Sequence, residues 1–194
     1  MRSFLSFVRP RAVVLILSLA VLAACSPEYD WRRVQPAEGG FATMLPAKPA
    51  QMSRSVSLDG LAIEMTLHGA RVHEVAYTVG VLKLPDDDAA TRERVLAALR
   101  HSMAANIGGS EQGAVPVMVQ VEDAAGQRRA PMPALEVEVH GRMRDQAAVM
   151  TARFLAQGRQ AWQIMVLAPA AAQARPGHAE SVTQFLDGFV LIAQ

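Results

Sequence analysis

Cysteine is almost absent from this chain, because Cys25 is the only one among its 194 residues. A single thiol excludes an intrachain disulfide, and it excludes a zinc site built from paired cysteines. The short motifs of several enzyme classes are also missing. The sequence has no Gly-x-Ser-x-Gly, no Gly-rich phosphate loop and no His-Glu-x-x-His. We therefore expect a protein that is not an enzyme and that holds no metal or cofactor.

An excess of charge of either sign is lacking as well. The chain has 19 basic and 18 acidic residues, for a formal net charge of +1. Proteins that bind nucleic acid present a basic field to the phosphate backbone. The balance of charges therefore predicts no nucleic-acid partner.

The N-terminus carries the only long apolar run. Residues 12–24 are apolar apart from Ser18, and they follow Arg2, Arg9 and Arg11 with no acid among them. The run is shorter than the roughly 20 residues of a membrane-spanning helix. It matches the apolar region of about 7–15 residues in a secretory signal peptide, and the arginines match the basic region before it. The pattern therefore predicts an exported protein.

The segment Leu22-Ala23-Ala24-Cys25 resembles the lipobox of bacterial lipoproteins. In that family the cysteine thiol takes a diacylglyceryl group, and signal peptidase II cuts between the residues matching Ala24 and Cys25. The resemblance implies a signal peptide at residues 1–24 and lipid, including palmitate, on Cys25. An ordinary cleaved signal and an uncleaved anchor are the alternatives. Two or three acyl chains hold a protein on a membrane durably, whereas one chain does not.

The same resemblance implies a location. A lipid on Cys25 makes the membrane one partner, and an envelope protein of unknown identity is the other expected partner. In enterobacterial sorting, Asp directly after the lipidated cysteine favours the inner membrane. Ser26 stands there in this chain. We therefore expect an outer-membrane lipoprotein that faces the periplasm, in a host with two membranes.

The mature chain is long enough for one domain. Cleavage before Cys25 leaves 170 residues, and it removes three arginines from the 19 basic residues, so 16 face 18 acidic ones. Residues 25–40 contain prolines and no periodic pattern, which predicts a tether. Ser26–Gly40, fully extended, reaches at most roughly 50 Å. Tyr29 and Trp31 lie either at the bilayer surface or, as we favour, with Trp31 folded back onto the domain.

Residues 41–194 predict a single α+β domain. Strands are expected at 41–45, at 53–58 and at 61–68, and Asp59-Gly60 is a strong hairpin signal between the last two. Leu61 to Leu67 alternates apolar and polar residues, which predicts one buried face and one exposed face that includes Glu64 and His68. Gly69 is expected to break this strand, and a Val-rich strand resumes over 70–84.

The rest of the chain predicts two helices and further strands. Apolar residues recur at helical spacing over 88–106, and Asp86 to Asp88 are expected to cap that helix rather than bind metal. Strands are expected at 115–121, 134–140, 147–156, 160–168 and 189–192, with a loop at 169–176 and a helix at 178–187. The expected architecture is a mainly antiparallel sheet packed by two helices.

The two ends of the domain resemble PsbP-like and DcrB-like domains. Phe41-Ala42-Thr43-Met44-Leu45-Pro46 is similar to their opening strand, and the likeness spans about residues 34–193. Their ending is matched by an aromatic strand, a helix and a last apolar segment, here Trp162, Ile164, Val166, Phe185, Gly188, Phe189 and Leu191. The resemblance implies a sandwich of sheet and helices. It also implies a non-catalytic accessory or binding module of the envelope, with no shared catalytic residues.

One polar surface supports a competing hypothesis. Glu136, Glu138 and His140 share a strand face, and arginines at 142, 144 and 153 favour cross-strand ion pairs there. If His68 joins these three side chains in a cleft, the surface would suit a small periplasmic hydrolase or a metal-dependent enzyme. His68 and His73 are five residues apart, so they lie on opposite faces unless Gly69 forms a bulge. A structural envelope protein without a ligand is the third hypothesis.

Overall fold

The computed structural model describes residues 28–193, so the predicted signal peptide and Cys25 lie outside the described residues. Ten strands of the described residues form one sheet, in the order β1-β2-β10-β6-β7-β8-β9-β5-β4-β3. Their bounds are β1 Arg32–Val34, β2 Phe41–Leu45, β3 Ala50–Leu58, β4 Leu61–Val72, β5 Val75–Lys83, β6 Ser110–Glu122, β7 Arg128–Met143, β8 Gln146–Gln157, β9 Gln160–Pro169 and β10 Val190–Ile192.

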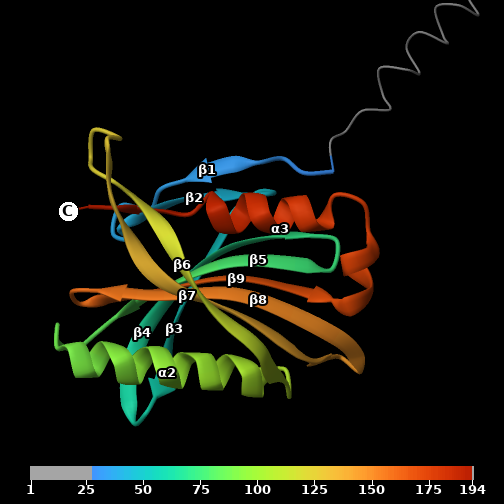
Figure 1. Ribbon diagram of the computed structural model, residues 1–194, viewed down its shortest axis with the longest axis horizontal. Coiled ribbons are helices and arrows are strands. Elements are labelled where there is room, and N and C mark those ends of the chain that lie inside the picture. The colour runs from blue at the N-terminus through green and yellow to red at the C-terminus, as the bar shows by residue number, and fades with distance from the viewer. Residues whose placement is uncertain (1–27, 194) are drawn as a thin grey trace, which may run out of the picture.

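Two α-helices cover opposite faces of this sheet (Figure 1). They are α2, Ala89–Asn106, and α3, His178–Asp187. Every strand pairing is antiparallel except that of β10 with β6, which is parallel. The expected α+β class, with a mainly antiparallel sheet and two helices, is confirmed.

The sheet is curled so strongly that its ends meet on the α3 side. Six strands lie between β2 and β4 in the sheet order, yet the ring centroids of Phe41 on β2 and His68 on β4 are 5.6 Å apart. Aromatic side chains fill the space between, and they include Phe41, Tyr77, Trp162, Phe185 and Phe189. A second cluster packs under α2, with Val95 and Leu99 of the helix against strands β4, β7 and β8. Curling therefore encloses an aromatic core that a flat sheet of ten strands would leave open.

The local signals for hairpins and helices are largely confirmed. Asp59 and Gly60 join β3 to β4 with φ angles of 49° and 75°, which are the positive values that a tight two-residue hairpin needs. On β4 the apolar set buries Ile63 and Met65. Helices α2 and α3 occur where the periodicity predicts them, and Gly188 follows α3 at its C-cap.

The expected strand break at Gly69 is wrong. β4 continues to Val72, and it pairs with β3 and β5 without a register shift. The turn comes at His73 and Glu74 instead, and His73 adopts a φ of 50°. Gly69 serves close packing, because a Cβ atom there would lie 2.9 Å from the carbonyl oxygen of Tyr77. The glycine thus marks a close approach of two strands.

The expectation of a tether through residue 40 is wrong for most of that segment. β1 pairs with β2, and the N–H of Asp30 donates to the carbonyl of Pro46 at 2.9 Å. Tyr29 stacks on Trp31 with centroids 5.8 Å apart, and Trp31 meets Tyr77 edge-on at 6.4 Å. The favoured interpretation, in which Trp31 folds back onto the domain, is confirmed. Aromatic burial fixes a segment whose short strand has no periodicity to detect.

Two smaller differences concern segments beside the helices. Asp88 is the N-cap residue of α2, but its carboxylate makes no capping hydrogen bond; the Asp86 carboxylate accepts the N–H of Asp88 at 3.1 Å instead. The expected loop at 169–176 contains one 3₁₀ turn, η1, at Ala170–Ala174. Ala172 is fully buried there. Small side chains let this turn pack closely on the sheet.

Candidate binding pocket

A polar pocket of about 370 Å³ lies between the β1–β2 loop and strands β3, β4 and β5. The three strands are in register, so alternate residues from each project onto the same face. That face is apolar along most of β5, with Tyr77, Val79 and Val81, and it is mainly polar along β3 and β4. The strand residues that line the pocket with polar groups are Gln51, Ser53, Glu64, Thr66, His68 and Lys83.

The opposite wall is the loop at residues 36–39. This loop is held in place by contacts with β5 and β9. The indole Nε1–H of Trp162 donates to the carbonyl of Gly39 at 2.9 Å, and that bond is buried. The side-chain amide of Gln160 donates to the carbonyl of Glu38 at 3.2 Å. Lys83 Nζ lies 3.5 Å from the Glu38 carboxylate at the rim. The loop is thus fixed at its backbone, which favours a pocket that exists before any ligand arrives.

His68 is the most buried polar group of the pocket lining. Its side chain is 6% exposed, and its ring meets Phe41 edge-on. Burial lowers the pKa of His68 below its ordinary value of 6.5, so the imidazole is neutral at pH 7. A neutral imidazole has one donor and one acceptor nitrogen. The expected exposed face of β4 is therefore wrong at His68, because the curl of the sheet brings Phe41 over it.

The polar groups of the pocket, as the described residues arrange them, include neither a serine–histidine pair nor a carboxylate–histidine pair. The Ser53 and Thr66 hydroxyls bond to each other at 2.9 Å, so this serine is not bonded to the histidine as a nucleophile would be. Glu64 and His68 are four residues apart on one strand, roughly 13 Å along it, which is too far for a carboxylate–imidazole pair. What remains is a set of hydroxyl, amide, imidazole and carboxylate groups around a cavity. Pockets of this size hold small molecules.

Glu136, the first residue of the predicted polar surface, belongs to a structural ion pair. Arg153 on the neighbouring strand donates from Nε to Glu136 at 2.7 Å, which confirms the predicted cross-strand pairing. The same guanidinium donates to the carbonyl of Leu186 at 2.8 Å and lies 2.8 Å from the carboxylate of Asp187. Arg153 thereby places a cation at the C-terminus of α3, where the helix dipole favours it. The cluster fastens the helix to the sheet.

Glu138 and His140 are paired with each other rather than with His68. Their contact, from His140 Nε2 to Glu138 Oε1, is 2.7 Å, and both side chains are about half exposed. His68 lies on the same face of the sheet, but strands β5, β9 and β8 stand between β4 and β7. At about 4.8 Å per strand, the histidine is roughly 19 Å away along the sheet. The four candidate residues therefore do not converge in one cleft.

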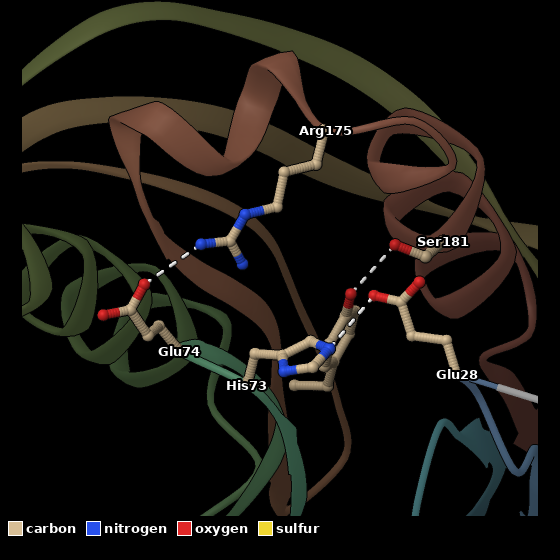
Figure 2. A network of polar contacts seen from close by, with 6 residues as sticks. Glu28, His73, Glu74, Arg175 and Ser181 are labelled. Atoms are coloured by element: carbon tan, nitrogen blue, oxygen red, sulfur yellow. Dashed lines mark hydrogen bonds and ion pairs between the residues drawn. The ribbon is translucent and has the colours of Figure 1, made fainter. Parts of the chain in front are cut away.

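A second network lies at the β4–β5 turn, and Figure 2 shows it. His73 Nε2 is 3.3 Å from the Glu28 carboxylate, and Arg175 is 3.1 Å from that of Glu74. Beneath them the hydroxyls of Tyr77 and Ser181 are 2.9 Å apart, in a buried bond. Burial raises the pKa of Tyr77 to about 12, so its hydroxyl stays protonated. We call these six residues the turn network.

Sequence reasoning missed both the pocket and the turn network. Their members come from segments as distant as residues 28, 73 and 175, and no spacing along the chain links them. Glu64 carried a signal only as part of the polar half of an alternating strand. His68 was also a candidate site residue, but for a cleft with Glu136, Glu138 and His140 that does not form. Within residues 28–193, no group of three or more acidic, histidine or cysteine side chains is arranged to hold a metal ion. Over the same residues, no helix is long and apolar enough to cross a membrane.

In comparisons with known proteins, no family model matches the chain, and no curated protein matches it.

Proposed function

We propose that the protein is a lipid-anchored envelope lipoprotein whose domain is a non-catalytic binding module, with the β3–β4–β5 pocket as its binding site. The observation that carries the binding half is the pocket itself. A fixed loop and three strands surround about 370 Å³ with hydrogen-bonding groups, and the serine at the site is bonded to a threonine. We propose as its ligand a small molecule rich in hydroxyl or amide groups, because neutral His68 and its neighbours offer donors and acceptors to such groups.

The anchoring half of the proposal rests on Cys25 and its lipobox. Two helices on opposite faces of a mainly antiparallel sheet agree with a PsbP-like or DcrB-like accessory domain, which supports an accessory role in the envelope. Ser26 supports an outer-membrane location facing the periplasm. Growth with a palmitate analogue tests the anchor. Wild type should incorporate the label and Cys25→Ala should not, and equal labelling of both would contradict the proposal.

Density-gradient fractionation tests the location. The wild-type protein should sediment with outer-membrane markers, because Ser26 lacks the retention signal that Asp provides at that position. A Ser26→Asp variant is the matched comparison, and it should move toward inner-membrane fractions. Wild type found mainly with inner-membrane markers would contradict the location while leaving the lipid anchor intact.

The binding site is tested by thermal shift against a panel of small glycans and short neutral peptides. At least one member should raise the melting temperature of the purified protein, since a ligand that binds only the folded state stabilises it. The shift should be lost in Gln51→Ala/Thr66→Val, which removes two hydrogen-bonding groups from the pocket. It should be retained in the matched variant Gln146→Ala/Thr151→Val on β8. A shift that survives the pocket substitutions, or no shift with any member, would contradict the site.

A further inference from the structure

The packed domain begins almost immediately after the proposed lipid-bearing residue. Glu28, three positions after Cys25, pairs with His73 at 3.3 Å. Asp30 is hydrogen-bonded to Pro46, and Trp31 packs on Tyr77. From Glu28 onward the chain is therefore held against the domain, and it does not act as a spacer.

The short connection limits how far the domain stands from its anchor. An extended backbone covers at most about 3.3–3.6 Å per residue, so the Cα atom of Glu28 lies within about 11 Å of that of Cys25. The roughly 50 Å reach that a tether to residue 40 would give is not available. A cysteine bearing a diacylglyceryl group sits at the headgroup layer, so Glu28 must lie close to that layer.

Several turns share the end of the domain where Glu28 lies. They are the β4–β5 turn with His73, the β7–β8 turn with Arg144, and η1, and in Figure 1 all three lie on the right, the side on which the described chain begins. Arg71, Arg144 and Arg175 are exposed at these turns; Arg175 also pairs with the Glu74 carboxylate, and Arg71 donates to the Glu74 carbonyl. Guanidinium groups pair well with phosphate, which every phospholipid headgroup carries. The β8–β9 turn lies at the other end of the same strands (Figure 1).

We propose that this end of the domain, formed by the β4–β5 turn, the β7–β8 turn and η1, rests on the phospholipid surface. The inference depends on the proposed lipid at Cys25. It adds a fixed orientation, in which the Lys83 side of the pocket is turned away from the bilayer, because Lys83 and the β4–β5 turn stand at opposite ends of β5. An orientation of this kind leaves the pocket rim open to soluble ligands of the periplasm.

The two ends of strand β8 provide labelling positions that test this orientation. Gln146 and Gln157 are its first and last residues, and both are exposed glutamines. Eleven residue steps at about 3.4 Å separate them by roughly 37 Å. Gln146 is at the proposed membrane end and Gln157 is at the remote end. A thiol introduced at either place is unique once lipid occupies the Cys25 sulfur.

The experiment uses the lipidated full-length protein, reconstituted into vesicles of phosphatidylcholine and phosphatidylglycerol with an acceptor dye on a fraction of the headgroups. Gln146→Cys and Gln157→Cys each carry the same donor dye, and energy transfer to the surface is measured. The proposal predicts several-fold stronger transfer from position 146 than from 157. Vesicles without acceptor give the reference emission.

The outcomes distinguish failure of the proposed orientation from failure of the proposed lipid anchor. Equal transfer from both positions would mean that the domain tumbles on its anchor, and stronger transfer from 157 would mean the opposite orientation; either result overturns the proposal while the lipid anchor stands. Mass spectrometry of the Cys25 peptide is run on the same samples. A peptide without a lipid adduct would overturn the orientation together with the anchoring half of the proposed function.

Discussion

The turn network and the pocket use polar side chains in opposite ways, although both lie on the α3 side of the same sheet. In the turn network the groups satisfy one another: Glu28 with His73, Glu74 with Arg175, and Tyr77 with Ser181. In the pocket Ser53 bonds to Thr66 and Lys83 pairs with Glu38, but among residues 28–193 no side chain forms a hydrogen bond or ion pair with His68, Gln51 or Glu64. Paired groups hold elements together, whereas polar groups around a cavity remain available to a ligand.

The largest expected loss of stability follows removal of Tyr77 from the turn network. Tyr77 is fully buried and contacts Trp31 and Phe185, so Tyr77→Ala should lower the free energy of unfolding by about 3–5 kcal/mol. Tyr77→Phe keeps the ring and loses only the bond to Ser181, which is worth about 0.5–1.5 kcal/mol. Urea denaturation measures both. Equal losses in the two variants would mean that the ring contributes nothing beyond its hydroxyl.

A smaller loss is expected at the ion pair of β7 and β8. Arg153 is mostly buried and serves Glu136, Asp187 and the end of α3. Arg153→Ala leaves the half-buried Glu136 carboxylate without its partner, which should cost about 1–3 kcal/mol in urea denaturation. Asp187→Asn touches only the exposed partner and should change stability by less than about 1 kcal/mol. If Asp187→Asn loses as much stability as Arg153→Ala, the contact of Arg153 with α3, rather than its pair with Glu136, accounts for most of the stabilisation.

Acid should weaken the domain through two buried histidines. Burial lowers the pKa of His68 from its ordinary value of 6.5. Burial, and to a smaller extent the positive charge of Arg175, lowers the pKa of His178 from the same value. The unfolded chain therefore binds more protons than the folded chain below about pH 6.5. Stability is complete above that pH and falls as the pH drops through 6.5 toward the lowered folded values.

Melting temperatures between pH 8 and pH 5 test this dependence. The decline should be shallower in His68→Gln and in His178→Gln than in wild type, because each variant removes one of the two titrating groups. Val115→Ala, an exposed substitution without a titrating group, is the control and should keep the wild-type slope. Slopes that are the same in all four proteins would assign the acid sensitivity to other groups.

The smallest expected effects compare one exposed carboxylate from each region. Glu28→Gln removes the charge opposite His73, an exposed pair, and should cost less than about 1 kcal/mol. Glu64→Gln in the pocket removes no ion pair found among the described residues and should leave the urea midpoint within about 0.5 kcal/mol of wild type. A larger loss for Glu64→Gln than for Glu28→Gln would reverse the distinction drawn between the two regions.

The fold was predictable where local chemistry and tertiary packing agree. Asp59-Gly60 specifies a hairpin by its φ angles, and α2 and α3 follow apolar residues at helical spacing. The turns at His73-Glu74 and Arg144-Asp145 were not predicted, because neither contains glycine, although His73, Arg144 and Asp145 all take positive φ. Pairing of the flanking strands forces these residues into a conformation that their own preferences oppose.

The candidate site was predictable only in part. Glu136 and Arg153 were expected to form a cross-strand pair, and they do, because period-two alternation fixes which neighbours share a face. The place of His68 was not predictable, since Phe41 covers it from across six strands of a curled sheet. No distance along the chain encodes that contact.

The sequence alone determined the local features of this protein: an apolar N-terminal run with Cys25 at its end, a hairpin at Asp59-Gly60, two helices and a mainly antiparallel sheet. These features depend on neighbours within a few residues, so local sequence patterns predict them. Only the tertiary structure decided the curl of the sheet, the burial of His68 and the docking of Glu28 to Val34 on the domain. Those features depend on contacts between distant segments, where burial of aromatic rings outweighs local preference.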